Sequence, residues 1–204
     1  MANICMDTVV FYSKNEKQKD GLLKLKSALD ICYPVGTTSK ERYFKKLFDY
    51  LKLDTYGMHV RGDIVYYSSD DDCVALECDS AWSPMYEAYC LLGTHFHVNF
   101  VMSAEEPSSN IYTNTDYSGR FLITRYKVQL HKRPDDGSLD NLYKALKGDK
   151  EIFFESCKEL LKWFREKAEI SAGSLSALRK KLNPDYVTIY KFTNPYHKVT
   201  AKLS

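Results

Sequence analysis

The sequence lacks long apolar runs and the common signatures of nucleotide-binding and hydrolytic enzymes. No apolar run approaches the ~20 residues that a membrane-spanning helix needs. The patterns G-x-x-x-x-G-K, G-x-G-x-x-G and G-x-S-x-G are all absent, which argues against P-loop, dinucleotide-binding and α/β-hydrolase proteins. The first residues show no basic region followed by an apolar core, so we expect no signal peptide. We therefore expect a cytoplasmic protein with no cofactor and no membrane contact.

The sequence also lacks a complete set of metal ligands. His95 and His97 have strand-like spacing and Cys90 lies nearby, but a structural zinc ion usually takes four ligands. The acidic run Asp70–Asp72 has no spaced ligand series with a distal Glu, as a calcium loop would have. The six cysteines lie mostly in apolar patterns, where a free thiol behaves as a small hydrophobic group. We expect reduced cysteines and no bound metal.

What the sequence does contain is the material for a folded core and an uneven distribution of charge. Of 204 residues 44% are hydrophobic, and 16 Tyr and 10 Phe are too many aromatics for a disordered chain. The net charge is +2. Residues 1–130 hold 14 Lys and Arg and 17 Asp and Glu, whereas residues 131–204 hold 15 and 10. This asymmetry predicts a boundary between two modules near residues 131–137.

The stretch Cys73–Glu106 predicts a strand–helix–strand unit. Cys73–Cys78 and His97–Ser103 alternate apolar and polar residues, which is typical of half-buried strands. Ser83 is a candidate N-cap for the helix between them, and Pro84 fits the first helical position. Apolar side chains recur there at helical spacing, at Met85, Tyr89, Leu92 and Phe96.

The other elements expected before residue 131 complete a mixed α+β domain. They are a strand at Ile4–Tyr12, a helix capped by Asn15, a second helix capped by Ser39, a strand at Val60–Tyr67 and a long strand at Phe121–Leu130. The order strand–helix–(helix)–strand–strand–helix–strand is the ferredoxin-like split βαβ pattern with one inserted helix, built on an antiparallel sheet. The first strand and the Cys73–Cys78 strand are expected to be neighbours at its centre. The long last strand belongs to a hairpin that is expected to extend the sheet or cover its edge.

The remaining residues, 131–204, predict a mostly helical extension with a final strand. Ser138 is a candidate cap for a helix over Leu139–Leu146, and a strongly amphipathic helix is expected from Ile152 to about Ala168. A third helix is expected around Leu175–Leu182, followed by a strand over Tyr186–Phe192. The predicted organisation is therefore a ferredoxin-like domain over residues 1–130 and this extension packed on it.

One run supports a family resemblance that covers roughly residues 1–130. Asp79-Ser-Ala-Trp-Ser-Pro84 before a helix, the opening Met1-Ala-Asn-Ile-Cys5 and the later Glu105-Glu106-Pro107 are similar to the YubB-like ferredoxin-like domain family. The resemblance implies a split βαβ fold and an origin on plasmids, phages or conjugative elements, many of them in Bacteroidales. The chain departs from the family after the acidic pair, where it reads Ser108-Ser-Asn-Ile-Tyr112. The resemblance brings no catalytic residue.

Strand alternation predicts an acidic face on the side of the sheet away from the helices. If Val74 and Leu76 face the helices, Glu77 and Asp79 face away, and Asp7, His97 and Asn99 are expected to join them. Such a set of carboxylates with a histidine suits metal binding or acid–base chemistry. The alternative is a solvated face or one covered by the later hairpin. Asp7, Glu77, Asp79 and His97 are thus the candidate catalytic residues of a hydrolase.

The favoured function is nevertheless a non-enzymatic accessory protein that binds another protein. Nucleic acid is a second, less favoured partner, and its contacts are expected on basic helices and not on the acidic sheet face. The candidate residues for that contact are Lys45, Lys46, Arg179, Lys180 and Lys181. The aromatic motif of single-strand RNA readers with this topology is absent.

Trp82 is expected to be a buried anchor. It precedes the candidate N-cap Ser83, where a large apolar residue often packs back on the first helical turns. Truncation of a buried ring to alanine would cost roughly 3–5 kcal/mol. The alternative is an exposed aromatic that belongs to a binding surface.

Overall fold

The computed structural model describes residues 3–38, 41–137, 139–146 and 148–196 of the chain. The candidate caps Ser39 and Ser138, and the opening Met1-Ala2, lie outside these residues. The chain divides into two compact units, Met1–Asp116 and Tyr117–Ser204, which we call the first and second units. No helix in the described ranges combines the length and apolar character needed to cross a membrane.

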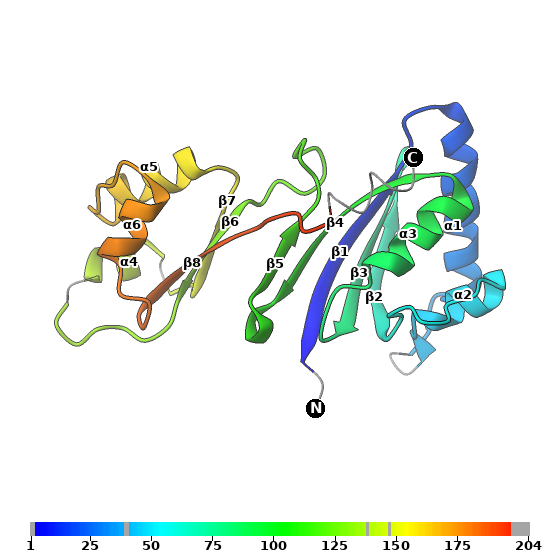
Figure 1. The fold of residues 1–204 in the computed structure, drawn as a ribbon, viewed down its shortest axis with the longest axis horizontal. Coiled ribbons are helices and arrows are strands. Elements are labelled where there is room, and N and C mark those ends of the chain that lie inside the picture. The colour runs from blue at the N-terminus through cyan, green and yellow to red at the C-terminus, as the bar shows by residue number, and fades with distance from the viewer. Residues whose placement is uncertain (1–2, 39–40, 138, 147, 197–204) are drawn as a thin grey trace. The chain divides into compact units, whose positions relative to one another are not determined.

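The first unit is an antiparallel five-stranded sheet with helices packed on one face (Figure 1). The strands are β1 (Ile4–Tyr12), β2 (Gly62–Ser69), β3 (Cys73–Ala81), β4 (Asn99–Glu106) and β5 (Ile111–Asn114). Their order in the sheet is β2-β3-β1-β4-β5. The expected central pairing is confirmed, because β1 pairs with β3 along its whole length, from Ile4 opposite Ala81 to Tyr12 opposite Cys73.

The helices of the first unit are α1 (Glu16–Cys32), α2 (Lys45–Leu51) and α3 (Tyr86–Phe96). The predicted cap of α1 is confirmed, since the Asn15 side chain accepts a hydrogen bond from the Gln18 amide. The helices bury Leu25, Leu29 and Leu92 against the sheet. On the sheet side, β1 and β3 contribute alternate residues to this core, among them Val9, Phe11 and Leu76.

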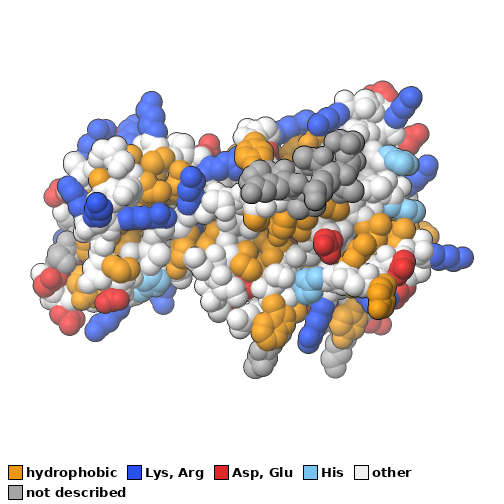
Figure 2. Space-filling model, in the orientation of Figure 1, with side chains coloured by type: hydrophobic (Ala, Val, Ile, Leu, Met, Phe, Trp, Pro, Cys, Tyr) orange, Lys and Arg blue, Asp and Glu red, His pale blue; other side chains and the backbone are white. Residues whose placement is uncertain are grey.

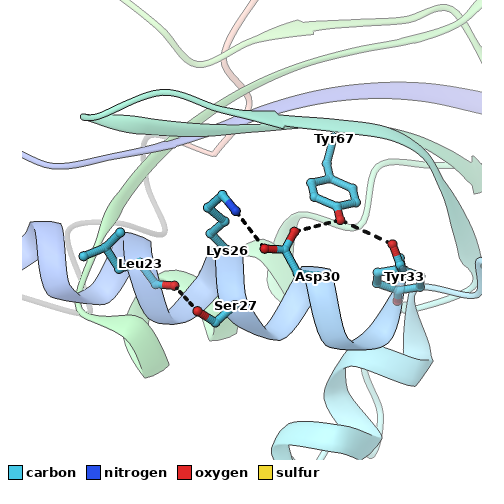
Figure 3. A network of polar contacts seen from close by, with 6 residues as sticks. All are labelled: Leu23, Lys26, Ser27, Asp30, Tyr33 and Tyr67. Atoms are coloured by element: carbon cyan, nitrogen blue, oxygen red, sulfur yellow. Dashed lines mark hydrogen bonds and ion pairs between the residues drawn. The ribbon is translucent and has the colours of Figure 1, made fainter. Parts of the chain in front are cut away.

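A polar network ties α1 to the strand at the sheet edge (Figure 3). Asp30 on α1 accepts hydrogen bonds from the Lys26 ammonium at 2.7 Å and from the Tyr67 hydroxyl of β2 at 3.0 Å. The carbonyl oxygen of Tyr33 lies 3.3 Å from the same hydroxyl. The ammonium of Lys26, and then the Tyr67 hydroxyl, lower the pKa of Asp30. The end of α1 and the middle of β2 are thereby held together.

The segment before α2 covers the first half of the β2 edge. The Phe44 amide donates to the Gly62 carbonyl at 2.8 Å, and the Ile64 amide donates to the Arg42 carbonyl at 2.9 Å. The Arg42 guanidinium also donates to the carbonyl of Val65. Covering an edge in this way blocks the addition of another strand there, and it brings α2 beside the end of β2.

The second unit is a three-stranded antiparallel sheet packed against short helices. Its strands are β6 (Tyr126–Leu130), β7 (Glu151–Phe154) and β8 (Val187–Lys191), in the order β7-β6-β8. Its helices are α4 (Asp140–Ala145), α5 (Cys157–Lys167) and α6 (Leu175–Lys181). The core is apolar and comes from every element, including Val128, Leu142, Leu160, Phe164, Leu178 and Ile189.

Two expectations about the second half of the chain are corrected here. The hairpin that contains Phe121–Leu130 was expected to extend the first sheet or cover its edge. β5 does extend the first sheet beside β4, but β6 pairs with β7 and β8 instead. The division between units therefore falls at Asp116 and Tyr117 and not near residue 130. Residues 151–154 form a strand and not the start of a helix, because a short apolar run fits either period and the pairing with β6 decides.

Candidate functional site

The predicted acidic face does not form as expected, because Asp7 lies on the helix side of the sheet. In the β1 register Asp7 stands opposite Cys78 on β3 and Ala104 on β4, which are both buried. Its neighbour Met6 faces the open side instead and is 53% exposed, whereas Asp7 is 2% exposed. An Asp7 on the open face would require Met6 to face the helices, and a shift of one residue in the alternation moves every side chain of a strand to the other face.

Asp7 instead organises the start of α3. Its carboxylate accepts hydrogen bonds from the Tyr89 hydroxyl at 2.7 Å, the Ser80 hydroxyl at 3.1 Å and the Met85 amide at 3.2 Å. Met85 is the N-cap of α3 and has no side-chain cap of its own, so the predicted cap at Ser83 is wrong. Burial raises the pKa of Asp7, and the hydrogen bonds, led by that of Tyr89, oppose the rise. These contacts give Asp7 a structural role.

The other three candidate catalytic residues do not meet at one point either. Glu77 and Asp79 lie on the open face of β3 as predicted. His97 belongs to no strand; it ends α3 in the left-handed conformation, with φ of 55°. Asn99 begins β4, and its side-chain amide donates a hydrogen bond to the side-chain oxygen of Gln18 at 3.0 Å. Across the described ranges, no three His, Cys, Asp or Glu side chains are arranged to hold a metal ion.

A pocket of about 1040 Å³ lies at the C-terminal end of β3, between the sheet and α2. Its walls come from the start of β1, the start of β2, the end of β3, the segment before β2 and the first residues of α2. Apolar surface is provided by Ile4, Tyr43, Met58, Val60 and Ala81. A pocket of this size with mostly apolar walls and a few convergent polar groups is the usual form of a binding site.

The polar feature of the pocket wall is a pair of aspartates, Asp63 on β2 and Asp79 on β3. The two residues stand directly opposite each other in the antiparallel register. The Oδ1 atom of Asp63 is buried and has no hydrogen-bond partner. Burial, and secondly the charge of Asp79, raise the pKa of Asp63. No Lys or Arg among the described residues forms an ion pair with either carboxylate.

Three of the other charged or titratable side chains that line the pocket, Lys45, Lys46 and His59, have contacts with other residues. Lys45 forms an ion pair with Asp49 one turn along α2. The ammonium of Lys46 lies 5.6 Å from the centroid of the Tyr33 ring. The His59 ring nitrogen Nε2 lies 3.1 Å from the carbonyl oxygen of Ser83. Arg61 also lines the pocket, and neither it nor the two lysines forms an ion pair with Asp63 or Asp79.

Trp82 lies beside this pocket and is not a buried anchor. Its side chain is 55% exposed and its backbone has φ of 75°, a left-handed conformation that bulky residues rarely adopt. Its amide donates to the carbonyl of Asn3 at 2.8 Å, and both Asn3 and the preceding Ala81 line the pocket. The expectation of burial is therefore wrong, because the chain turns at Trp82 and directs the ring away from the core.

The candidate nucleic-acid residues belong to two different units. Lys45 and Lys46 are on α2 in the first unit and line the pocket. On α6 of the second unit, the Arg179 guanidinium donates to the carbonyl of Ile189 at 2.6 Å and the Lys181 ammonium donates to the carbonyl of Ser171 at 2.7 Å. Two of the three basic residues on α6 thus hold the second unit together.

Asp63 reaches the open face of the sheet through a β-bulge, which strand alternation alone does not predict. Between Ile64 and Tyr66 the β2–β3 register shifts, so Ile64 stands opposite Cys78 and Asp63 opposite Asp79. Uninterrupted pairing from Tyr66 would place Asp63 opposite Ser80, on the helix side. The neighbouring Gly62 is compatible with a bulge, but a glycine alone does not indicate which way the register moves.

Comparison of the chain with protein-family models, curated proteins and solved structures gave no match in any of the three.

Proposed function

We propose that the protein is a non-enzymatic binding protein whose first unit receives a basic side chain of a protein partner in the pocket beside α2. The observation that carries this proposal is the buried Oδ1 atom of Asp63, which accepts no hydrogen bond. The residue opposite Asp63 in the sheet is a second aspartate, Asp79. A buried acceptor without a donor costs about 1–3 kcal/mol. A ligand that brings donors and positive charge recovers this cost on binding.

The chemistry of the pocket suits the side chain of arginine or lysine. A guanidinium group presents several donors in a planar fork and pairs with carboxylates in a bidentate manner. The aliphatic stem of such a side chain packs on apolar surface while its charge pairs elsewhere. Met58, Val60 and Ala81 provide that apolar surface, and Asp63 and Asp79 provide the acceptors.

The surroundings of the pocket favour a protein over a small free cation. Ile4 is 58% exposed, Tyr43 61% and Met6 53%, and Trp82 stands on the turn that follows β3. Aromatic residues and methionine are enriched in protein–protein interfaces, and a few of them carry most of the binding energy. A peptide with a basic residue between apolar ones would occupy the pocket and cover these side chains.

The alternative of a metal-dependent or acid–base hydrolase gains no support from the geometry. It needs several of Asp7, Glu77, Asp79 and His97 around one point. Asp7 faces the opposite side of the sheet from Asp79, and its carboxylate is occupied by three donors. Of the four residues only Asp79 lines the pocket.

We also infer that the first unit has the ferredoxin-like split βαβ topology. What supports the inference is the antiparallel strand order β2-β3-β1-β4, with α1 between β1 and β2 and α3 between β3 and β4. β5 adds a strand next to β4, and α2 is the inserted helix. Membership of the YubB-like family, a role on a mobile element and a cytoplasmic location are part of the same proposal.

The experiment that tests the proposed function is selection of random peptides displayed on phage against the immobilised full chain. We expect enrichment of sequences that contain Arg or Lys flanked by apolar residues. The same selection on the Asp63→Asn, Asp79→Asn double variant should lose this enrichment. Glu77→Gln on the same strand is the matched control and should keep it. Enrichment of basic peptides that persists in the double variant would contradict the proposal.

A further inference from the structure

The second unit carries a basic groove along α5. The groove has a volume of about 500 Å³ and runs between one face of the helix and the loop at residues 171–173. Lys158, Lys162 and Arg165 line it, and these positions follow one another at four- and three-residue spacing along the helix. Side chains at such spacing lie on the same helix face. Leu161 and the loop residues form the rest of the lining, which contains no acidic residue.

Two of these cations are not engaged elsewhere. Lys158 and Lys162 are exposed, and neither forms a hydrogen bond or an ion pair with another residue of the described part of the chain. Arg165 lies 3.5 Å from a carboxylate oxygen of its neighbour Glu166, on the exposed surface. Exposed ion pairs of this kind contribute little and exchange readily for another anion. The groove therefore presents positive charge to an incoming ligand.

The groove is built on a fixed scaffold. Ser156 caps α5 by accepting a hydrogen bond from the Glu159 amide, and Leu160 and Phe164 are fully buried on the inner face of the helix. The Lys181 ammonium donates to the carbonyl of Ser171 and so fixes the opposite wall. The two walls of the groove, the helix α5 and the loop at residues 171–173, are thus both held in place by the fold.

The net charge of the second unit also favours an anionic ligand. Residues 117–204 hold 18 Lys and Arg and 10 Asp and Glu, a net charge of +8, whereas residues 1–116 hold 11 and 17, a net charge of −6. Figure 2 shows Lys and Arg side chains gathered over the part of the molecule where Figure 1 labels α5 and α6. Such a concentration of positive charge attracts polyanions at long range.

We propose that this groove binds the sugar–phosphate backbone of a nucleic acid strand. With a rise of 1.5 Å per residue, Lys162 lies about 6 Å and Arg165 about 10 Å along the axis from Lys158. In a duplex each strand offers one phosphate per roughly 3.4 Å of helix axis, so a row of cations about 10 Å long can contact more than one phosphate of a strand. Arginine and lysine are the usual phosphate ligands.

The lining of the groove also indicates how the strand is recognised. None of the residues that line it is aromatic, so no ring is available there to stack on bases. Binding through phosphates alone carries no sequence information. A protein partner would instead need an apolar or aromatic centre for tight binding, and Leu161 and Ala172 provide little of it. We therefore assign the groove to nucleic acid of any sequence.

The test is the fluorescence anisotropy of a labelled 20-nucleotide single-stranded DNA of mixed sequence, titrated with the full chain over a range of salt concentrations. The Lys158→Glu, Lys162→Glu variant should weaken binding at least about tenfold and flatten the dependence of affinity on salt, because two phosphate contacts are lost. The matched control is Lys132→Glu, Lys144→Glu, which makes the same change of charge at exposed positions of the same unit. It should weaken binding less than about threefold.

Three results would overturn the proposal. The first is an equal loss of affinity in both variants, which would mean that only net charge matters. The second is wild-type protein that leaves the DNA unbound at low salt. The third is a poly-glutamate peptide that competes as well as unlabelled DNA of equal charge, which would assign the groove to acidic protein segments. Circular dichroism of both variants shows whether they are folded, and Lys158→Gln, Lys162→Gln replaces a variant that is not. This test does not depend on the pocket of the first unit.

Discussion

Asp63 on β2 stands directly opposite Asp79 on β3, and the Oδ1 atom of Asp63 is buried without a hydrogen-bond partner. Like charges directly opposite each other in a sheet are destabilising. The fold tolerates this pair at the wall of its large pocket, where a stability cost is typical of a site that awaits a ligand. The proposed function rests on this relationship.

Replacing Asp63 by Asn should stabilise the protein at neutral pH. The raised pKa of Asp63, caused by burial and then by Asp79, means that the folded chain binds more protons than the unfolded chain above pH about 4. Stability from this group is therefore present at low pH and is lost as the pH rises through the folded pKa. We expect Asp63→Asn to gain about 1 kcal/mol at pH 7, because the residue is only partly buried.

Urea unfolding of the Asp63→Asn variant at pH 7 and at pH 3.5 measures this effect. The gain in unfolding free energy should be present at pH 7 and should shrink at the lower pH, where the wild-type carboxyl is itself protonated. A loss of stability at pH 7, or the same difference at both pH values, would show that the carboxylate is not under electrostatic strain.

Asp7 and Met6 are neighbours in β1 on opposite faces, and their alanine variants should differ sharply. Asp7→Ala removes the acceptor for Tyr89, Ser80 and the Met85 amide, and we expect a loss of about 3 kcal/mol because buried donors are left unpaired. Met6→Ala removes a side chain that is 53% exposed and should cost less than about 1 kcal/mol. Chemical denaturation of the two variants measures the difference, and similar losses would mean that the β1 faces have been assigned wrongly.

Trp82 should tolerate truncation, in contrast to the 3–5 kcal/mol expected of a buried ring. Trp82→Ala should change the unfolding free energy by about 1 kcal/mol or less, since the ring is 55% exposed. Trp82→Gly should be at least as stable as Trp82→Ala, because glycine adopts a φ of 75° without steric cost. Thermal melts of both variants are the measurement. A glycine variant clearly less stable than the alanine variant would contradict the left-handed turn.

Arg179 and Lys180 are adjacent on α6 and should behave differently on replacement by alanine. The Arg179 guanidinium donates to the carbonyl of Ile189 on β8, so Arg179→Ala should destabilise the second unit by about 1–2 kcal/mol. Lys180 is exposed, and Lys180→Ala should change stability by about 0.5 kcal/mol or less. Hydrogen exchange at the β8 amides reports the effect locally. Equal protection in the two variants would argue against a structural role for Arg179.

Much of the first unit could be predicted from its sequence because its strands and helices have clear periods. The central β1–β3 pairing, the Asn15 cap and the helix before β4 all follow from apolar spacing and capping residues. The second sheet was missed because alternation shows that a segment such as Tyr126–Leu130 is a strand but not which strand it pairs with. Pairing between segments distant in sequence is decided by the core that they bury together.

The candidate site was harder to predict because it depends on facing and register. Met6 and Asp7 both occur in a strand with apolar residues on each side, so the pattern alone did not decide which of them points inward. The bulge between Ile64 and Tyr66 then moved Asp63 to the open face. Of the predicted acidic residues, Asp79 alone lines the pocket, and its partner Asp63 emerged only from the register.

The most direct test of the central claim is a two-dimensional ¹H–¹⁵N NMR titration of the protein with N-acetyl-arginine amide. The matched probe is N-acetyl-citrulline amide, which has nearly the same shape and no charge. We predict that the arginine probe shifts the amide resonances of Asp63, Asp79 and Ala81, that citrulline does not, and that Asp63→Asn, Asp79→Asn removes the response. Equal shifts with both probes, or arginine-induced shifts that persist in the double variant, would contradict the assignment of this pocket to a basic side chain.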